Sequence, residues 1–480
     1  MLTVLLAGDS HGLRLLRLIS FLAVLFFPSS LSAQPLEPDT AGLFNSLPPE
    51  LAIPERTEVV QRAALPVAAP LSAPTSVLRG EVNGVLGALN TYGSVVDFSR
   101  NQVLGYPLRN APTFTYDTKL YLDTSFTGQD LLHVRLRSGN FQPSAFWFSD
   151  PTQLARLQVG WESQPCSSGS SPCRRNSIIL NRAYYQFPLL HNVRATVGAR
   201  VLQTDILPVF PSVYTDAKIL QLFQFAGAHG AYSRRLGPGF GLAWEPTPSR
   251  RGLTVGVASI QAQGESGSPD EGGLFNPYSG QATTAQLALT QSSWNVTVAY
   301  TANGSPARLR GTPLANSLTR DSSVGLVSSW SLAGYWQPHA AGLWPSLSVG
   351  YGFDHLRFAN FSMPQVSSAQ TRSWMIGLVW RNVLAQGNSL GLALGSPNHI
   401  SSLQGTDVAG VNDSLLAMEA YYRLRLSDHV QVIPALFWIS RPRGAMTATT
   451  SADQAIEQPD LNARSSLGVV GGLVQMVVRY

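Results

Sequence analysis

The chain has 480 residues, and only 13% of them are charged, against roughly 25% in a typical soluble protein. Apolar residues make up 44%, and the mean hydropathy is +0.04. Beyond residue 30 no apolar run approaches the roughly 18 residues that a membrane-spanning helix needs, which excludes a helical membrane protein. The class that remains is an all-β transmembrane barrel, whose polar residues point inward.

The first 33 residues have the order of a secretory signal peptide. Arg14 and Arg17 precede an apolar run at 18–27, and a small-residue site follows. Cleavage is predicted after Ala33 or, one residue earlier, after Ser32. An amino-terminal membrane anchor is the alternative, but the run is too short to span a bilayer.

Residues 34–78 contain eight prolines and no sustained period, which predicts an extended periplasmic linker. From 79 to 480 the pattern changes to alternating segments separated by turn residues, which predicts one barrel domain. Barrels of this kind have an even number of strands, so one of seventeen candidate segments is expected to be extra and about sixteen to be real. The candidates are centred near residues 85, 121, 135, 158, 182, 197, 241, 256, 286, 297, 327, 350, 377, 392, 420, 435 and 473.

Several segments carry aromatic residues at both ends of one apolar face. Trp294 and Tyr300 bracket two valines, and Trp374 and Trp380 repeat the arrangement. Six strand residues cover roughly 20 Å, so this pattern fits a lipid-facing band between two aromatic girdles. A soluble β-sandwich also alternates, but it gives no reason for aromatics at both strand ends.

The opposite face of the strands is predicted to line a water-filled lumen, where charged side chains set an electrostatic preference for the solute. Arg182 is the weakest candidate because its segment is apolar on both faces, and charge pairs that only hold the wall in shape are the alternative role. The predicted pore-lining residues are Lys119, Tyr121, Asp123, Arg135, Arg137, Arg182, Arg194, Arg200, Glu419, Arg423 and Arg425.

The two cysteines, Cys166 and Cys173, favour a loop disulfide in an exported chain, with two free thiols as the alternative. No histidine is near them, so a zinc site is not expected. No cofactor is implied, and the sequence has no catalytic or phosphate-loop motif. Loss of the leader lowers the net charge from +5 to +4, too small to indicate a nucleic-acid partner.

The last strand ends on an aromatic residue, with Val478 and Tyr480 on one face. This ending resembles the carboxy-terminal insertion signal of bacterial outer-membrane barrels. The resemblance implies the barrel-assembly machinery and outer-membrane lipid as partners.

Five segments together resemble one family: Leu120–Phe141, Leu180–Pro188, Gly272–Asn276, Gly387–Gly391 and Leu416–Trp438. They are similar to the cyanobacterial iron-uptake porins of the carbohydrate-selective (OprB-type) porin superfamily. The resemblance implies a sixteen-stranded, trimeric channel in the outer membrane that passes ions and small hydrophilic solutes, with sugar or iron suggested by family naming. Many relatives carry an amino-terminal surface-layer-homology domain that grips peptidoglycan, and here the proline-rich linker stands in its place.

The segment from Asp205 to Arg235 resembles in position the inward-folded constriction loop of porins. An outward extracellular loop is the alternative. The charged candidates in it are Asp205, Asp216, Lys218, Arg234 and Arg235.

The sequence is therefore compatible with two functions. The first is a diffusion porin for small hydrophilic solutes and ions. The second is an outer-membrane barrel without a channel, with a structural or enzymatic role.

Overall fold

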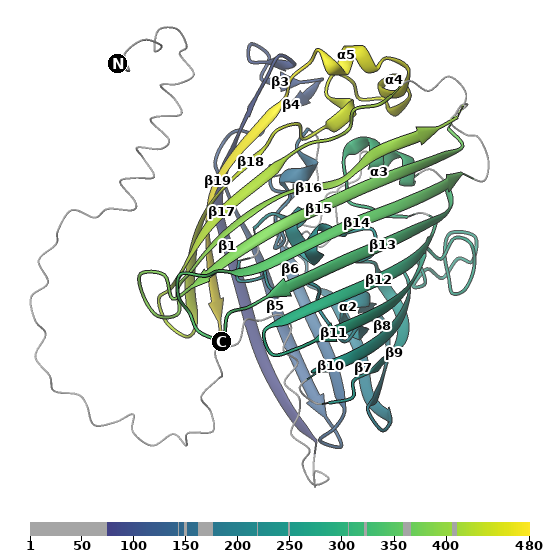
Figure 1. Cartoon of the computed structure of the whole chain (residues 1–480), viewed down its shortest axis with the longest axis vertical. Coiled ribbons are helices and arrows are strands. Elements are labelled where there is room, and N and C mark those ends of the chain that lie inside the picture. The colour runs from purple at the N-terminus through teal and green to yellow at the C-terminus, as the bar shows by residue number, and fades with distance from the viewer. Residues whose placement is uncertain are drawn as a thin grey trace, which may run out of the picture. The chain divides into compact units, whose positions relative to one another are not determined.

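A computed structural model shows sixteen strands closed into an antiparallel barrel (Figure 1). It describes residues 74–142, 144–147, 151–161, 176–217, 219–247, 250–305, 307–320, 324–358, 366–405 and 410–480. The predicted signal peptide, all but the last five residues of the predicted linker, both cysteines and Lys218 lie outside these ranges.

The barrel strands follow the chain around the wall, each paired with its neighbour in sequence. They are β1 (Thr75–Tyr92), β5 (Thr113–Ser125), β6 (Leu131–Gly139), β7 (Ile179–Leu190), β8 (Val193–Leu202), β9 (Leu236–Trp244), β10 (Gly252–Gln261), β11 (Gln281–Thr290), β12 (Trp294–Gly304), β13 (Val324–Trp336), β14 (Ser346–Phe358), β15 (Ser368–Arg381), β16 (Ser389–Gln404), β17 (Ala417–Arg425), β18 (Val430–Ile439) and β19 (Gly468–Arg479). The first strand begins at Thr75, within the last four residues of the segment predicted as linker.

The barrel closes where the first strand meets the last. β1 pairs with β5 on one side and with β19 on the other. The backbone N–H of Gly80 donates to the carbonyl of Tyr480 (2.7 Å), and the N–H of Tyr480 donates to the carbonyl of Gly80 (3.1 Å). The terminal residue thus completes the ladder, so no strand edge is left open.

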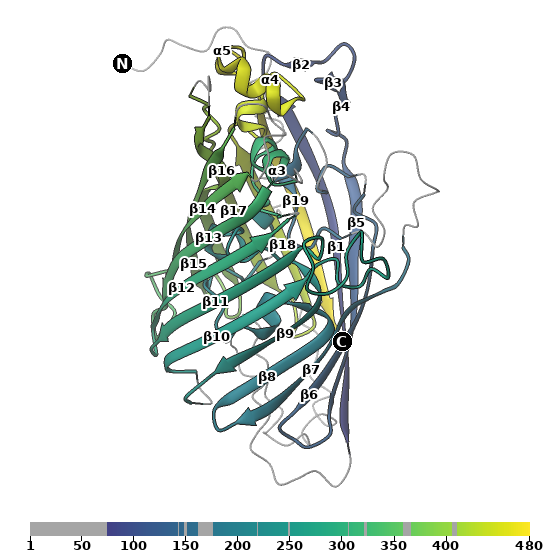
Figure 2. The same cartoon turned by 90° about the vertical axis from the view of Figure 1, so that its right-hand side faces the viewer.

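The two ends of the barrel differ in the length of their connections (Figures 1 and 2). At the turn end, where Thr75 and Tyr480 lie, the connections are short, as at 126–130, 191–192 and 426–429. At the loop end they are long and carry a small sheet of β2 (Val96–Asp97), β3 (Gln102–Val103) and β4 (Tyr106–Pro107). The helical segments in these connections are η2 (Gln153–Ala155), α2 (Gln203–Ile206), η3 (Gln221–Gly227), α3 (Pro313–Arg320), η4 (Gly444–Met446), α4 (Ala452–Glu457) and α5 (Pro459–Ala463). Membrane barrels keep short turns on the periplasmic side and long loops outside.

The outer face carries the predicted apolar band. Trp294 of β12 lies opposite Trp336 of β13, and six residues further along, Tyr300 lies opposite Trp330 with ring centroids 4.6 Å apart. Val298 is among the exposed aliphatic residues between them. Aromatics therefore bracket an apolar face that points away from the interior, as a lipid-facing wall requires.

One predicted strand does not exist. The segment near 158 contains η2 and an isolated antiparallel bridge from Leu157 to Leu220, and both leucines are buried. Its alternation reflects packing inside the barrel, against inward-facing Val85, Phe437 and other residues of a common apolar cluster. The other sixteen predicted centres fall in the sixteen strands of the wall.

No helix among the described residues is long and apolar enough to span a membrane.

An arginine placed in the middle of the apolar band should destabilise the folded barrel. Val298→Arg is expected to lower the free energy of unfolding by about 2–4 kcal/mol, because charge at the bilayer midplane is not solvated. Gln281→Arg, at the exposed loop end of β11, is the matched control and should cost about 0–1 kcal/mol. Urea titration in lipid vesicles measures both, and equal effects of the two substitutions would contradict a lipid-facing band.

Candidate functional site: the barrel lumen

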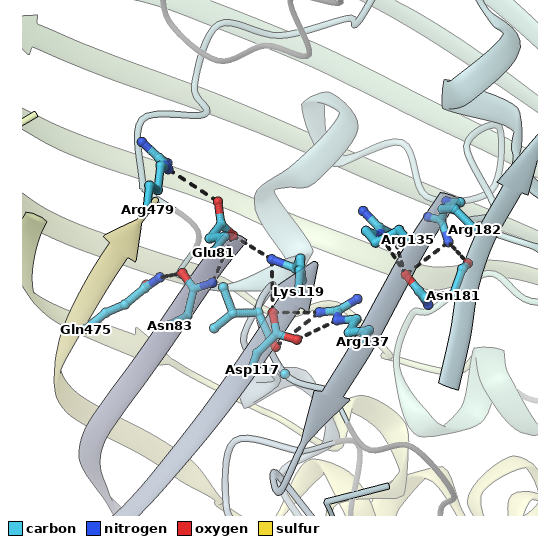
Figure 3. Close-up of polar contacts among 12 residues, drawn as sticks. Glu81, Asn83, Asp117, Lys119, Arg135, Arg137, Asn181, Arg182, Gln475 and Arg479 are labelled. Carbon is cyan, nitrogen blue, oxygen red and sulfur yellow. Dashed lines mark hydrogen bonds and ion pairs between the residues drawn. The ribbon is translucent and has the colours of Figure 1, made fainter. Parts of the chain in front are cut away.

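A continuous ladder of polar side chains crosses the inner wall at β19, β1, β5 and β6 (Figure 3). The Lys119 ammonium lies between two carboxylates, 2.6 Å from Glu81 and 3.0 Å from Asp117. Arg137 on β6 pairs with Asp117 at 2.5 Å, and Arg479 on β19 with Glu81 at 3.4 Å. Lys119 and Arg137 are both buried, so this ladder holds neighbouring strands together as well as facing inward.

The ladder continues onto β7 through a β-bulge at Asn181. The Asn181 side-chain oxygen accepts from Arg135 Nε (2.8 Å), and the bulge turns both Asn181 and Arg182 away from lipid. Arg182 then pairs with Asp205 at 2.8 Å. The apolar segment that made Arg182 a weak candidate thus reaches the interior through an irregularity that alternation does not predict.

Nearer the turn end, aromatic rings and charges share the inner wall. His133 Nδ1 lies 2.6 Å from Asp123, which also pairs with Arg79. The His133 ring lies 6.0 Å from that of Tyr121 and stacks on Tyr184 at 4.8 Å. Tyr121, His133 and Asp123 are partly exposed on this wall, whereas Tyr184 is buried behind them.

The β8–β9 connection, residues 203–235, folds into the barrel and covers the inner wall from β10 to β17. Tyr214 donates its hydroxyl to Glu419 (2.8 Å), and the Leu220 N–H donates to the other oxygen of the same carboxylate (2.7 Å). The Ser348 hydroxyl of β14 accepts from the Val213 N–H (2.9 Å). The loop therefore lies inside the barrel, as expected, and the alternative of an outward loop is wrong.

Glu419 faces inward but does not line open space, since the loop buries it to 4% exposure. Asp216 lies 3.6 Å from Arg423, and Arg235 is buried against the carbonyls of Gly280 and Gly304. These side chains of the loop and of β17 therefore fasten the loop to the wall.

A second connection, between β6 and β7, also enters the barrel. Gln158 N–H donates to the Ile219 carbonyl (2.7 Å), and Gln221 N–H donates to the Arg156 carbonyl (2.9 Å). Arg137 packs over the Trp161 ring at 4.3 Å, which joins this loop to the polar ladder. The β6–β7 and β8–β9 connections thus pair with one another inside the lumen. The alternating pattern near residue 158 had predicted a wall strand in the first of them.

Arg200 is not a lumen residue. A register shift in β8 lies between Gly198 and Val201, and Arg200 stands opposite Ala183, which follows inward-facing Arg182 and so faces outward. Val201 is fully buried instead. Arg200 pairs with Glu265 of the β10–β11 connection at 2.5 Å, outside the barrel wall.

The remaining predicted arginines lie on the inner face near the turn end. Arg194 pairs with Glu245 (2.9 Å), and Arg425 pairs with Asp428 (2.7 Å). Val478 and Tyr480 both lie on the outer face of the last strand. The described residues hold no group of three or more His, Cys, Asp or Glu side chains that could bind a metal ion.

Sequence reasoning missed Arg156, Arg308 and Arg310, which belong to loops and have no alternating pattern. The available signal was a leucine flanked by two arginines at 308–310, and Leu309 is buried.

The comparisons with known proteins agree with this geometry. The model of the carbohydrate-selective porin, OprB family, matches residues 82–457. This chain belongs to the OprB family. The porin is therefore an outer-membrane protein, with its turn end at the periplasm and its loop end outside.

Relatives of this porin occur in cyanobacteria. An uncharacterised protein of Synechocystis sp. is 27% identical over 350 residues, 68% of this chain and 59% of that protein. An uncharacterised protein of Nostoc sp. is 26% identical over 373 residues, 72% of this chain and 60% of that protein. The chain thus spans about three-fifths of the length of these relatives.

Among solved structures, Pseudomonas putida OprB at high pH has a TM-score of 0.51 to this porin at 12% sequence identity. The match covers 84% of this chain and 94% of that one. At this identity the likeness is one of fold.

A buried carboxyl group joins three connections at the loop end. Asp413 accepts hydrogen bonds from the Thr312 hydroxyl (2.5 Å), the Ile400 N–H (2.7 Å) and the Ala445 N–H (2.8 Å). Burial raises the pKa of Asp413 from 3.8 to about 6, against the lowering effect of these hydrogen bonds.

The stability of this junction should depend on pH. Because the folded pKa exceeds the unfolded one, the contribution of Asp413 is fully present below pH 3.8 and is lost as pH rises through about 6. Protection of the Ile400 and Ala445 amides, measured by hydrogen exchange and corrected for intrinsic rates, should fall across this window. Asp413→Asn should remove the dependence, and an unchanged profile in that variant would assign it to another group.

Removing the carboxylate that anchors the inward loop should loosen the loop. Glu419→Ala leaves the Tyr214 hydroxyl and the Leu220 N–H without their acceptor, at a cost of about 1–3 kcal/mol each. We expect larger and noisier single-channel currents and faster amide exchange at Leu220. Met418→Ala, which changes the outward neighbour, is the control, and identical currents in the two variants would exclude a restraining role for Glu419.

Proposed function

We propose that this OprB-family porin is a water-filled channel through which small hydrophilic solutes diffuse passively across the outer membrane. The observation that carries the proposal is the opposite character of the two wall faces. The outer face is apolar and the inner face holds charged groups such as Lys119, Asp117 and Arg137. Charges inside a barrel that lies in lipid are stable where water or another charge reaches them.

Carbohydrates and ions are the proposed solutes, with iron as a further candidate. Support for sugars comes from the partly exposed rings of Tyr121 and His133, which lie beside Asp123 and Arg135 on the inner wall. Sugars have apolar CH faces that pack on rings and hydroxyls that bond to charged edges. Iron is proposed to enter as a hydrophilic complex.

The pore-lining role is proposed for the partly exposed inner residues Tyr121, Asp123, Arg135, Arg194, Arg423 and Arg425. The buried residues Lys119, Arg137, Arg182 and Glu419 are proposed to shape the wall. The inward loop, with Asp205, Asp216 and Arg234, is proposed as the constriction.

The wider organisation is also proposed. It comprises a signal peptide at 1–33, a periplasmic linker at 34–78, a homotrimer, and insertion by the barrel-assembly machinery through Val478 and Tyr480. The support is the sequence pattern and the outward position of these two residues.

A barrel without a channel remains the second candidate, because two loops share an apolar cluster inside the lumen. Phe146 and Leu157 of one loop and Phe223 of the other belong to it, and all three are buried.

Reconstitution separates the two functions. Purified, heat-modifiable protein in planar bilayers should give stepwise conductance, and liposomes that contain it should swell in small sugars faster than in large ones. A folded protein that gives neither signal would favour the closed barrel. Wild-type protein denatured before reconstitution is the control for leakage.

A further inference from the structure

Three arginines of the loop-end connections differ from those of the wall. Wall residues Arg137 and Arg182 have carboxylates at 2.5 and 2.8 Å. Arg156, Arg234 and Arg310 form no ion pair with any carboxylate in the part of the chain that the structure describes. Each of the three keeps part of its surface exposed.

Arg156, from the β6–β7 connection, is held in place by neutral groups. Its guanidinium lies over the Trp147 ring, 4.3 Å from the centroid, and donates to the Gly160 carbonyl (3.2 Å). Its Nε is buried with no hydrogen-bond partner. These contacts orient the planar group without neutralising its charge.

Arg234 and Arg310 converge on one segment, η3, of the β8–β9 connection. Arg310, from the β12–β13 connection, donates to Gln221 Oε1 (2.8 Å), and Arg234 donates to Gln224 Oε1 (2.5 Å). Amide oxygens orient both side chains, and again no negative charge is supplied.

The three charges are close enough to act on each other. Gln221, which accepts from Arg310, also donates its backbone N–H to the Arg156 carbonyl (2.9 Å). Burial first, and then the charges of Arg310 and Arg156, lower the pKa of Arg234. An arginine remains protonated in proteins, so three loops bring uncompensated positive charge to one place in the lumen.

Further donors beside the cluster are unused. Arg310 Nε and Gln221 Nε2 are buried without partners. His229, 1% exposed, adds no donor, because its one ring N–H bonds to backbone carbonyls and the unpartnered Nε2 of the neutral ring is an acceptor. Burial, followed by the charges of Arg310 and Arg234, lowers the pKa of His229 to about 3, so it is neutral near pH 7. Nearby groups therefore offer donors and no compensating anion.

We propose that Arg156, Arg234 and Arg310 form a binding site for small oxyanions inside the lumen, and that this site makes the pore prefer anions. The ligand class is inorganic phosphate or the phosphate or carboxylate group of a hydrophilic solute, because guanidinium forks match the geometry of these groups. The selectivity rests on the proposed channel function, whereas oxyanion binding does not. A free metal cation is repelled here, so an iron solute would pass as an anionic or neutral complex.

The test uses the whole protein and a charge-removing variant. Reversal potentials in a potassium chloride gradient measure ion preference for the wild type, for the triple variant Arg156→Gln, Arg234→Gln, Arg310→Gln, and for Arg100→Gln. Arg100 is exposed in the turn between β2 and β3 at the loop end and serves as the matched control. Calorimetric titration of the folded protein in detergent with inorganic phosphate measures binding independently of conductance.

The wild type and Arg100→Gln should prefer chloride severalfold, and phosphate should block their chloride current. In the triple variant the preference should fall close to unity and the block should weaken at least severalfold. A hexose monophosphate that blocks where the neutral hexose does not would identify a solute-borne phosphate as a ligand, and block by inorganic phosphate alone would restrict the site to the free ion.

Two failures are distinguishable. Phosphate binding to the folded wild type without any conductance would support the site and overturn the channel function. A wild-type channel that prefers cations would overturn the site and leave the channel function intact. The same conclusion would follow if the triple variant kept both the chloride preference and the phosphate affinity of the wild type. If the triple variant does not fold, the single variant Arg310→Gln is measured against the same criteria.

Discussion

The structure depends on satisfying every backbone hydrogen bond of a sheet that lies in lipid. An open edge in the bilayer would leave N–H and C=O groups without water, so the sheet closes on itself. Here the closing contact is the ladder between β1 and β19, which ends at the reciprocal bonds of Gly80 and Tyr480. Closure separates the lipid outside the barrel from the barrel interior, and the two faces of each strand differ for that reason.

The two halves of the inner wall differ in the side chains that they carry. From β19 through β1 to β7, the wall presents the ladder of Glu81, Lys119, Asp117 and Arg137. From β10 to β17 it carries small residues, and the inward loop packs on them. Gly350, for example, lies so close to Ala226 that a Cβ atom would not fit. One half of the wall thus carries a largely buried ladder of charged side chains, and the other half supports the inward loop.

The arginines of the loops differ from those of the wall in a way that affects which ions the interior can select. Wall arginines are largely compensated by carboxylates, as with Arg137 and Asp117. The loop arginines are oriented by amides and by a tryptophan ring. Selectivity in such an interior arises from charges that three separate connections bring together, so it is not a property of any single strand.

The sequence by itself determined the class, an approximate strand count and the two faces of most strands, whereas the inward loop was expected only from a resemblance to porins. Low charge and period-two alternation follow from lipid on one side and water on the other, and both are visible residue by residue. Only the tertiary structure decided three points. The segment near 158 packs inside the barrel, since an apolar run looks the same in a wall strand and in a buried loop. Arg200 faces outward because a bulge shifts its register. Arg156, Arg234 and Arg310 meet because loops distant in sequence fold into one lumen, and no local pattern encodes contacts of that range.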